Sequence, residues 1–137
     1  MLKRQEGFSL IELVIIIVVL GILASVAIPK YKSIIAESKE ASCKGSLGSL
    51  RSGISIYYAN TAVKTGTADW PDLDSVEVAG VVMEHAIPAN PYQTNAPDSI
   101  VTGVTKGTIV GARGGWAYKE SSGEIWPNTS GSSENNW

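Results

Sequence analysis

The sequence has one cysteine and one histidine, and this scarcity limits the chemistry open to it. Cys43 has no partner for an internal disulfide, and we interpret it as a small buried hydrophobic residue rather than a reactive thiol. His85 directly follows Glu84. The sequence around His85 supplies no activated nucleophile and no further residues at the spacing of metal ligands. We therefore expect no enzyme activity and no metal site in this chain.

Basic clusters and phosphate-binding glycine motifs are missing as well. The formal net charge is -2 and the Lys and Arg residues are scattered, so nucleic acid is not expected as a partner. The glycine pair at 114–115 is not followed by a helix signal, and no ATP-binding motif is present. Any energy for the protein's work must then come from partners. A hydrophobic fraction of 44% with 18% charged residues nevertheless indicates a folded chain.

The most conspicuous feature that is present is an apolar run at residues 8–28. As a helix this run would be about 31 Å long, which matches the roughly 30 Å hydrocarbon thickness of a bilayer. We therefore predict one membrane-spanning helix. Lys3 and Arg4 precede the run and Lys30 and Lys32 follow it, so the free amino terminus is what favours a cytoplasmic start.

An ordinary secretory signal is the alternative for the same segment. Residues 25–27, Ser-Val-Ala, would then be its small-residue cleavage site. Against this alternative, the run is longer than the roughly 7 to 15 apolar residues of such signals, and it contains Glu12. A charge at the centre of a membrane helix costs roughly 2.5 to 3.5 kcal/mol on insertion scales. The positive end of the helix dipole stabilises a carboxylate by only about 0.3 to 1 kcal/mol, which is less than this cost. We therefore expect Glu12 to have a further interaction partner.

The start of the chain combines a short basic leader ending in Gly7, the sequence FSLIEL at residues 8–13, and an apolar helix that contains Gly21 and Pro29. This combination resembles the class III signal of the type IV pilin superfamily, which includes the pseudopilins of type II secretion. The resemblance implies that a prepilin peptidase cuts after Gly7 and N-methylates Phe8.

The resemblance also supplies a partner for Glu12. In that family the glutamate at this place pairs with the amine of a neighbouring subunit, which here implies the Phe8 amine of the next copy. An α-amino group is mostly protonated at neutral pH, and unit charges about 4 Å apart attract by roughly 4 kcal/mol at an effective dielectric near 20. In filaments of the family, the stretch that corresponds to Gly21 through Pro29 tends to lose helical order; a simple proline kink at Pro29 is the alternative.

An apolar stripe continues the helical pattern at spacings of three and four residues, formed by Leu47, Leu50, Ile54 and Tyr57. We predict that the helix reaches about residue 60. The chain then divides into a leader (1–7), a transmembrane or filament-core helix (8–28), the amphipathic half of the same helix (29–60), and a globular head (61–137).

The head is predicted to consist of loops and short strands. Prolines and turn formers dominate residues 61–97, with one short helix near residues 71–77. Strand patterns follow at 99–105, 108–110, 115–119 and 124–126, and residues 121–123, Ser-Ser-Gly, suit a hairpin turn. The predicted fold class is α+β, a type IV pilin-like long helix packed on a small antiparallel sheet.

The cysteine content bears on which kind of type IV pilin-like protein the chain resembles. Type IVa pilins of adhesive surface pili usually close a carboxyl-terminal loop with a disulfide, which Cys43 alone cannot form, so the resemblance favours a major pseudopilin of type II secretion. The stretch IPANPY at residues 87–92 favours the same choice. Residues 131–137 offer one carboxylate and two amides, fewer hard oxygen ligands than calcium prefers, so no cofactor is expected.

On this interpretation the protein is a structural subunit of a short periplasmic fibre. The implied partners are further copies of itself, the prepilin peptidase, the inner-membrane assembly platform with its ATPase, minor pseudopilins, and membrane lipid before assembly. The implied location is the inner membrane, crossed once, with the head in the periplasm and the fibre in the periplasm or at the cell surface. The alternatives are a surface pilus for adhesion or motility and a membrane-anchored binding domain that never polymerises.

The processing signal leads to a first testable prediction. The mature chain should begin at Phe8 with a methylated amine, which intact-mass measurement of membrane-extracted protein tests. Gly7→Leu should leave the precursor uncut, because a large side chain would crowd a cleavage site that needs a small residue. A chain that begins at Ile28 would instead indicate ordinary signal-peptidase cleavage and a soluble product.

Overall fold

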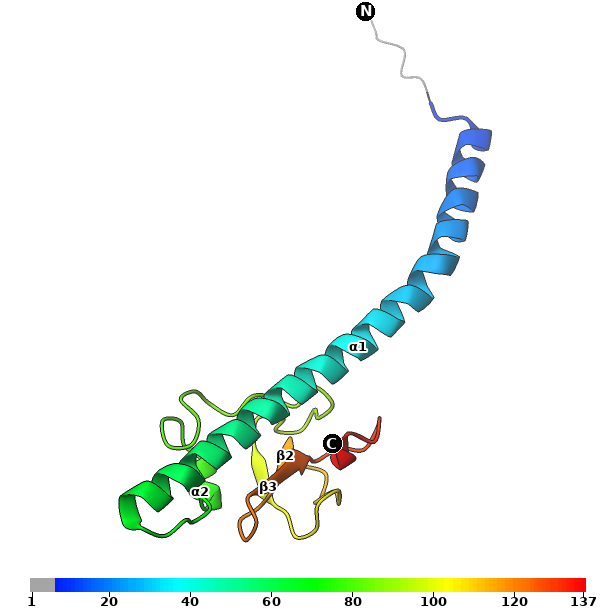
Figure 1. The fold of residues 1–137 in the computed structure, drawn as a ribbon. Coiled ribbons are helices and arrows are strands. Elements are labelled where there is room, and N and C mark those ends of the chain that lie inside the picture. Colours follow the sequence, from blue (N-terminus) through cyan, green and yellow to red (C-terminus); the bar gives the residue numbers. More distant parts are fainter. Residues whose placement is uncertain (1–6) are drawn as a thin grey trace, which may run out of the picture. The chain divides into compact units, whose positions relative to one another are not determined.

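The computed structural model describes residues 7–137, and the chain divides into two compact units, Met1–Ser38 and Lys39–Trp137. One long helix, α1 (Leu10–Thr65), begins in the first unit and ends in the second. The other elements all belong to the second unit (Figure 1): α2 (Leu73–Glu77), β1 (Ile100–Thr102), β2 (Trp116–Lys119), β3 (Glu124–Pro127) and a short 3-10 helix, η1 (Glu134–Asn136). The predicted leader, with Lys3 and Arg4, lies outside the described residues except for Gly7.

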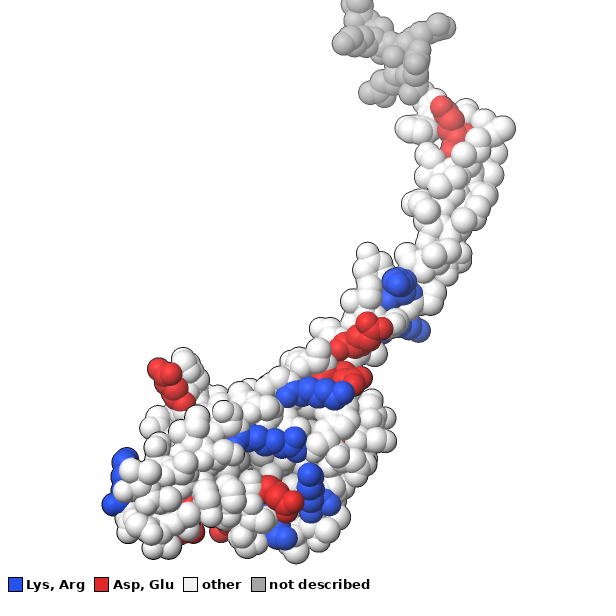
Figure 2. Space-filling view, viewed as in Figure 1, with Lys and Arg blue, Asp and Glu red and all other residues white. Residues whose placement is uncertain are grey.

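The first unit consists of helix with an uncovered apolar surface. Every large apolar side chain of residues 8–28 is exposed. The segment is long and apolar enough to cross a membrane, and Figure 2 shows very few charged side chains over it. Helix α1 continues through Gly21 and Pro29 without a break. This surface needs an apolar environment that the described part of the chain does not provide.

Helix α1 extends beyond the predicted end near residue 60. The Thr61 and Thr65 hydroxyls donate to carbonyl oxygens one turn earlier in the helix, at 3.0 Å and 2.9 Å. The helix then stops at Gly66, whose φ of +80° suits glycine and whose N–H donates to the Ala62 carbonyl at 3.0 Å. A glycine in this conformation is a common helix end, so the sequence did carry the signal.

In the second unit, the predicted apolar stripe of α1 packs against the sheet, and Figure 1 shows this part of the helix passing beside the strands. Leu47, Leu50 and Ile54 are buried, and Tyr57 is half-buried at the end of the stripe. The helix side of the core also includes Cys43, and the sheet side includes Trp116, Tyr118 and Ile125. The stripe is confirmed, and so is the burial of Cys43 as a small apolar residue.

The sheet is mixed rather than antiparallel, which corrects the prediction. Its strand order is β1-β2-β3; β1 pairs with β2 in parallel, with Ile100 opposite Trp116, and β2 pairs with β3 antiparallel. Parallel neighbours need a crossover of about a dozen residues or more, and residues 103–115 provide it. The predicted hairpin turn is confirmed, since the Gly123 N–H donates to the Lys119 carbonyl at 2.9 Å.

The predicted strand at residues 108–110 is wrong. The side chain of the buried residue Asn128 takes the place of a neighbouring strand there. Its Oδ1 accepts from the Val110 N–H at 2.6 Å, and its Nδ2 donates to the Val110 carbonyl at 3.0 Å. Because the Asn128 side chain satisfies both backbone groups of Val110, and Trp126 Nε1 donates to the Thr108 carbonyl at 2.9 Å, the segment lies against the head as a loop.

The buried stripe leads to a stability prediction with a matched control. Ile54→Ala should lower the free energy of unfolding by about 2 to 5 kcal/mol, because it leaves a cavity in the core. Ile56→Ala, on an exposed face of the same helix, should change it by less than about 0.5 kcal/mol. Denaturant unfolding of the full chain in detergent measures both. Equal losses for the two variants would contradict the placement of the core.

Candidate assembly site

The start of α1 is closed by a reciprocal hydrogen-bonded cap. The Ser9 N–H donates to Glu12 Oε2 at 2.8 Å, and the Glu12 N–H donates to Ser9 Oγ at 3.3 Å. This arrangement is a capping box, in which two N–H groups at the helix start are satisfied together. Sequence reasoning overlooked Ser9, although Ser-x-x-Glu before an apolar run is a signature of this motif.

The cap uses only part of the capacity of the Glu12 carboxylate. An ionised carboxylate has about four acceptor positions, and Ser9 occupies one of them, on Oε2. The Glu12 side chain is exposed, and Phe8 lies exposed one residue before the cap. A cut after Gly7 would leave the Ser9 N–H in place. The same carboxylate is therefore able to cap its own helix and to accept from an amine of another molecule.

Among the described residues, nothing gives Gly7 or Gly21 a steric reason to be glycine. A Cβ atom added at either position would meet nothing within 4 Å, and neither residue has a positive φ. The cut after Gly7 stays a prediction, because it depends on a peptidase outside the described chain. The loss of helical order between Gly21 and Pro29 stays a prediction about the filament, because α1 is continuous there in the single chain.

In the second unit, the closing loop (residues 129–137) is held on α1 without a disulfide. Arg51 Nη2 donates to the Ile125 carbonyl at 3.2 Å and to the Trp137 carbonyl at 2.5 Å. Lys44 Nζ lies 4.7 Å from the centre of the Trp137 ring, a cation–π contact. Tyr92 packs edge-on against the same ring at 6.3 Å. Two cations of α1 thus hold the loop in place of a covalent bond.

Glu134 is fully buried inside the closing loop and remains a carboxylate. Burial acts to raise its pKa, but hydrogen bonds from the Thr129 side chain and from backbone N–H groups outweigh that effect, so the pKa lies below its ordinary value. Two of these donors are the Gly131 N–H at 3.1 Å and the Ser132 N–H at 2.6 Å. The carboxylate therefore fixes the fold of the loop around itself.

Cys43 and Asn90 lie beneath this loop. The Cys43 thiol donates to Asn90 Oδ1 at 3.6 Å, and burial, assisted by the charge of Glu134, raises the pKa of the thiol to about 11. Asn90 Nδ2 donates to the Gly115 carbonyl at 2.7 Å, and Asn90 Oδ1 also accepts from the Tyr92 N–H at 3.0 Å. Residues 87–92 thus join the helix to the sheet, and Cys43 is poorly suited to reaction.

His85 and Glu84 are both exposed. The described residues contain no group of three or more His, Cys, Asp or Glu side chains that could hold a metal ion.

The family model described as the prokaryotic N-terminal methylation motif matches residues 2–28. The chain is 31% identical over 112 residues to "Fimbrial protein EcpC" of Eikenella corrodens, which covers 80% of this chain and 69% of that protein. It is 43% identical over 54 residues to "Type IV major fimbrial protein FimA" of Dichelobacter nodosus, which covers 39% of this chain and 35% of that protein.

A further relative is "Type IV major pilin protein PilE1" of Neisseria gonorrhoeae, 35% identical over 75 residues, which covers 55% of this chain and 32% of that protein. The chain thus spans about a third of the length of FimA and PilE1 and about two thirds of EcpC. No solved structure gives a significant match.

The buried carboxylate leads to a prediction about pH. Because the folded pKa of Glu134 lies below the ordinary 4.5, its stabilisation is present above that value and is lost as the pH falls through the folded pKa. Glu134→Gln should therefore be less stable than the parent at neutral pH, and the gap should narrow as the pH falls below 4.5 and through the folded pKa. Thermal unfolding of the full chain in detergent measures this gap. The exposed Glu84→Gln is the control, and a Glu134→Gln gap that is independent of pH would contradict the assignment.

Proposed function

Because the chain belongs to the type IV pilin superfamily, we propose that it is the polymerising subunit of a surface pilus. The observation that carries the proposal is the uncovered apolar half of α1, residues 8–28. Each larger apolar side chain moved out of water contributes about 1.5 to 3 kcal/mol, so the segment as a whole is worth tens of kcal/mol as an upper estimate. Such a segment is stable in lipid or among like helices, and a subunit that passes from one to the other fits both requirements.

The printed names of the relatives favour a pilus over a secretion fibre. All three are described as fimbrial or pilin proteins, and their names do not mention secretion. The pseudopilin interpretation is not confirmed by these comparisons, and it stands as the second candidate. The observation in its favour is the closing loop, which Arg51 and Lys44 hold without the disulfide usual in adhesive pilins.

The same proposal includes processing, partners and location. The exposed junction of Gly7 and Phe8 is suited to a prepilin peptidase, and the subunit is expected to cross the inner membrane once before assembly. An assembly platform with its ATPase would supply the energy, since the sequence has no nucleotide-binding motif. Minor pseudopilins would join only in the second candidate. No catalytic role and no cofactor are proposed.

A strain that lacks the protein separates the two candidate fibres. Loss of surface fibres with an unchanged set of exported proteins supports the pilus. Loss of exported proteins with normal surface fibres supports the pseudopilin. Electron microscopy scores the fibres, and proteomics of the culture medium scores export.

Assembly depends on Glu12 in this proposal, and Ser9 offers a matched control. Glu12→Leu should insert in the membrane at least as well as the parent, because it removes the costliest group from the apolar run. Fibres should be lost or sharply reduced, because an unpaired buried cation costs about 3 to 5 kcal/mol. Ser9→Ala removes part of the cap, at about 1 kcal/mol, but keeps the carboxylate and should still give fibres. Fibre number and length, scored beside a membrane-fraction assay, test both variants.

Two outcomes would contradict this account. Normal fibres from Glu12→Leu would leave Glu12 as a helix cap without a role between subunits. Equal loss of fibres in Glu12→Leu and Ser9→Ala would assign the defect to the cap itself rather than to the charge.

A further inference from the structure

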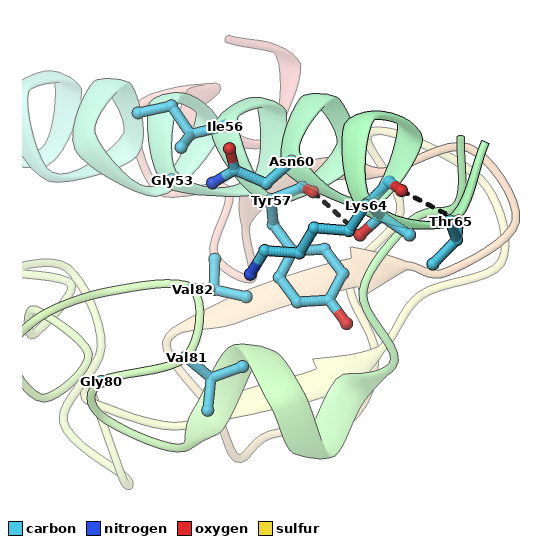
Figure 3. A pocket seen from close by; sticks show the side chains of 10 residues that line it. Gly53, Ile56, Tyr57, Asn60, Lys64, Thr65, Gly80, Val81 and Val82 are labelled. Carbon is cyan, nitrogen blue, oxygen red and sulfur yellow. Dashed lines mark hydrogen bonds between the residues drawn. The ribbon is translucent and has the colours of Figure 1, made fainter. Parts of the chain in front are cut away.

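The second unit has a groove on the surface of the head. One wall is the last part of α1, including Gly53, Ile56 and Lys64, and the other is residues 80–82 (Figure 3). Its volume is about 480 Å³. The two walls meet closely at Gly53, where an added Cβ would lie 2.7 Å from the Val82 carbonyl oxygen and 2.8 Å from Met83 Sδ.

The groove combines uncovered aliphatic side chains with polar side chains from the last turns of α1, among them Asn60 and Thr61. Ile56 is 58% exposed and Val81 is 48% exposed, on opposite walls. Val78, just before the groove, is also exposed. Lys64 is the one charged residue among the lining residues, and it forms no ion pair with another described residue. The groove therefore offers an aliphatic patch, formed by Ile56, Val81 and Val82, which is bordered by polar side chains and by one cation near the end of α1.

The first unit has an apolar stripe of matching character outside the predicted membrane segment. Tyr31, Ile34 and Ile35 lie on one face of α1 at spacings of three and four residues and are 66%, 48% and 57% exposed. Lys30 borders the start of this stripe, and Glu37 borders its end. Both the stripe and the groove leave apolar side chains uncovered in the part of the chain that is expected to meet water, so each needs a partner.

We propose that the stripe of one copy, residues 31–35, docks in the groove of a second copy, with Glu37 beside Lys64. The charges select the direction of docking. If the two helices run in parallel, Glu37 at the end of the stripe meets Lys64 at the end of the groove; in the opposite direction Lys30 would meet Lys64 and repel it. Copies in a filament built from the apolar halves of α1 run in parallel, so the docking rests on the proposed function.

The contact has the symmetry that an extended fibre needs. Stripe and groove are different surfaces, so each copy uses one surface on each side and the contact is heterologous. A heterologous contact that does not close into a ring generates an open helical filament.

The groove is too small to hold two copies together alone, since stable interfaces bury about 1,600 Å² in total. It acts as a second contact between copies that are already joined through their apolar helices. The first contact raises the effective concentration of the stripe of one copy near the groove of the next.

Cross-linking of mixed fibres tests the docking. Ile34→Cys and Val81→Cys are made in two differently tagged chains, co-assembled and oxidised. The docking predicts a disulfide between the two tags at least about tenfold above that of a control pair, Ile34→Cys with Val104→Cys. Val104 is 75% exposed and does not line the groove. The native thiol of Cys43 adds little background, since it is fully buried.

The outcomes separate this inference from the proposed function. Fibres that form normally but give no more of the mixed disulfide than the control pair overturn the docking and leave the function standing. If the parent chain forms no fibres in cells, both proposals fail.

Exchange of the charges gives a second test: Lys64→Glu and Glu37→Lys should each reduce fibre yield about fivefold, and the double exchange should restore it. Single variants with parental yield, or a double variant without rescue, would contradict the pairing of Glu37 with Lys64.

Discussion

The uncovered apolar surface of residues 8–28 is the constraint on which the rest of this structure depends. A helix that buries nothing against its own chain has no reason to form in water, and it gains its stability from lipid or from other helices. The second unit is then free to be small, because it has to cover only the other half of α1. The division of one helix between two environments explains how a chain of this length carries a helix as long as Leu10–Thr65.

Glu12 caps its own helix at the edge of that surface and, in the proposed fibre, would also accept from the amine of a neighbouring copy. Its reciprocal bonds with Ser9 satisfy backbone groups at the start of the helix, where an apolar environment would make unpaired N–H groups costly. The remaining acceptor positions face outward. The cap also holds the carboxylate in one orientation, so less rotamer freedom is lost when a cation approaches.

The closing loop shows a different solution to a problem that many small exported domains solve with disulfides. Here the buried carboxylate of Glu134 organises the loop from within, and Arg51 and Lys44 fasten it to α1 from outside. These interactions need no oxidising environment, although they depend on ionisation. The loop is therefore independent of redox conditions and sensitive to acid.

The sequence by itself determined the features that rest on local pattern. The apolar run, the stripe at Leu47, Leu50 and Ile54, and the turn at Gly123 follow from side-chain periodicity and glycine conformation, which act over a few residues. The tertiary structure decided what depends on distant partners. The parallel pairing of β1 with β2, the bonding of Asn128 to Val110, and the burial of Glu134 each join segments whose meeting is not encoded in any short pattern. The groove beside Gly53 has the same origin, since it exists only where residues 80–82 come to lie beside α1.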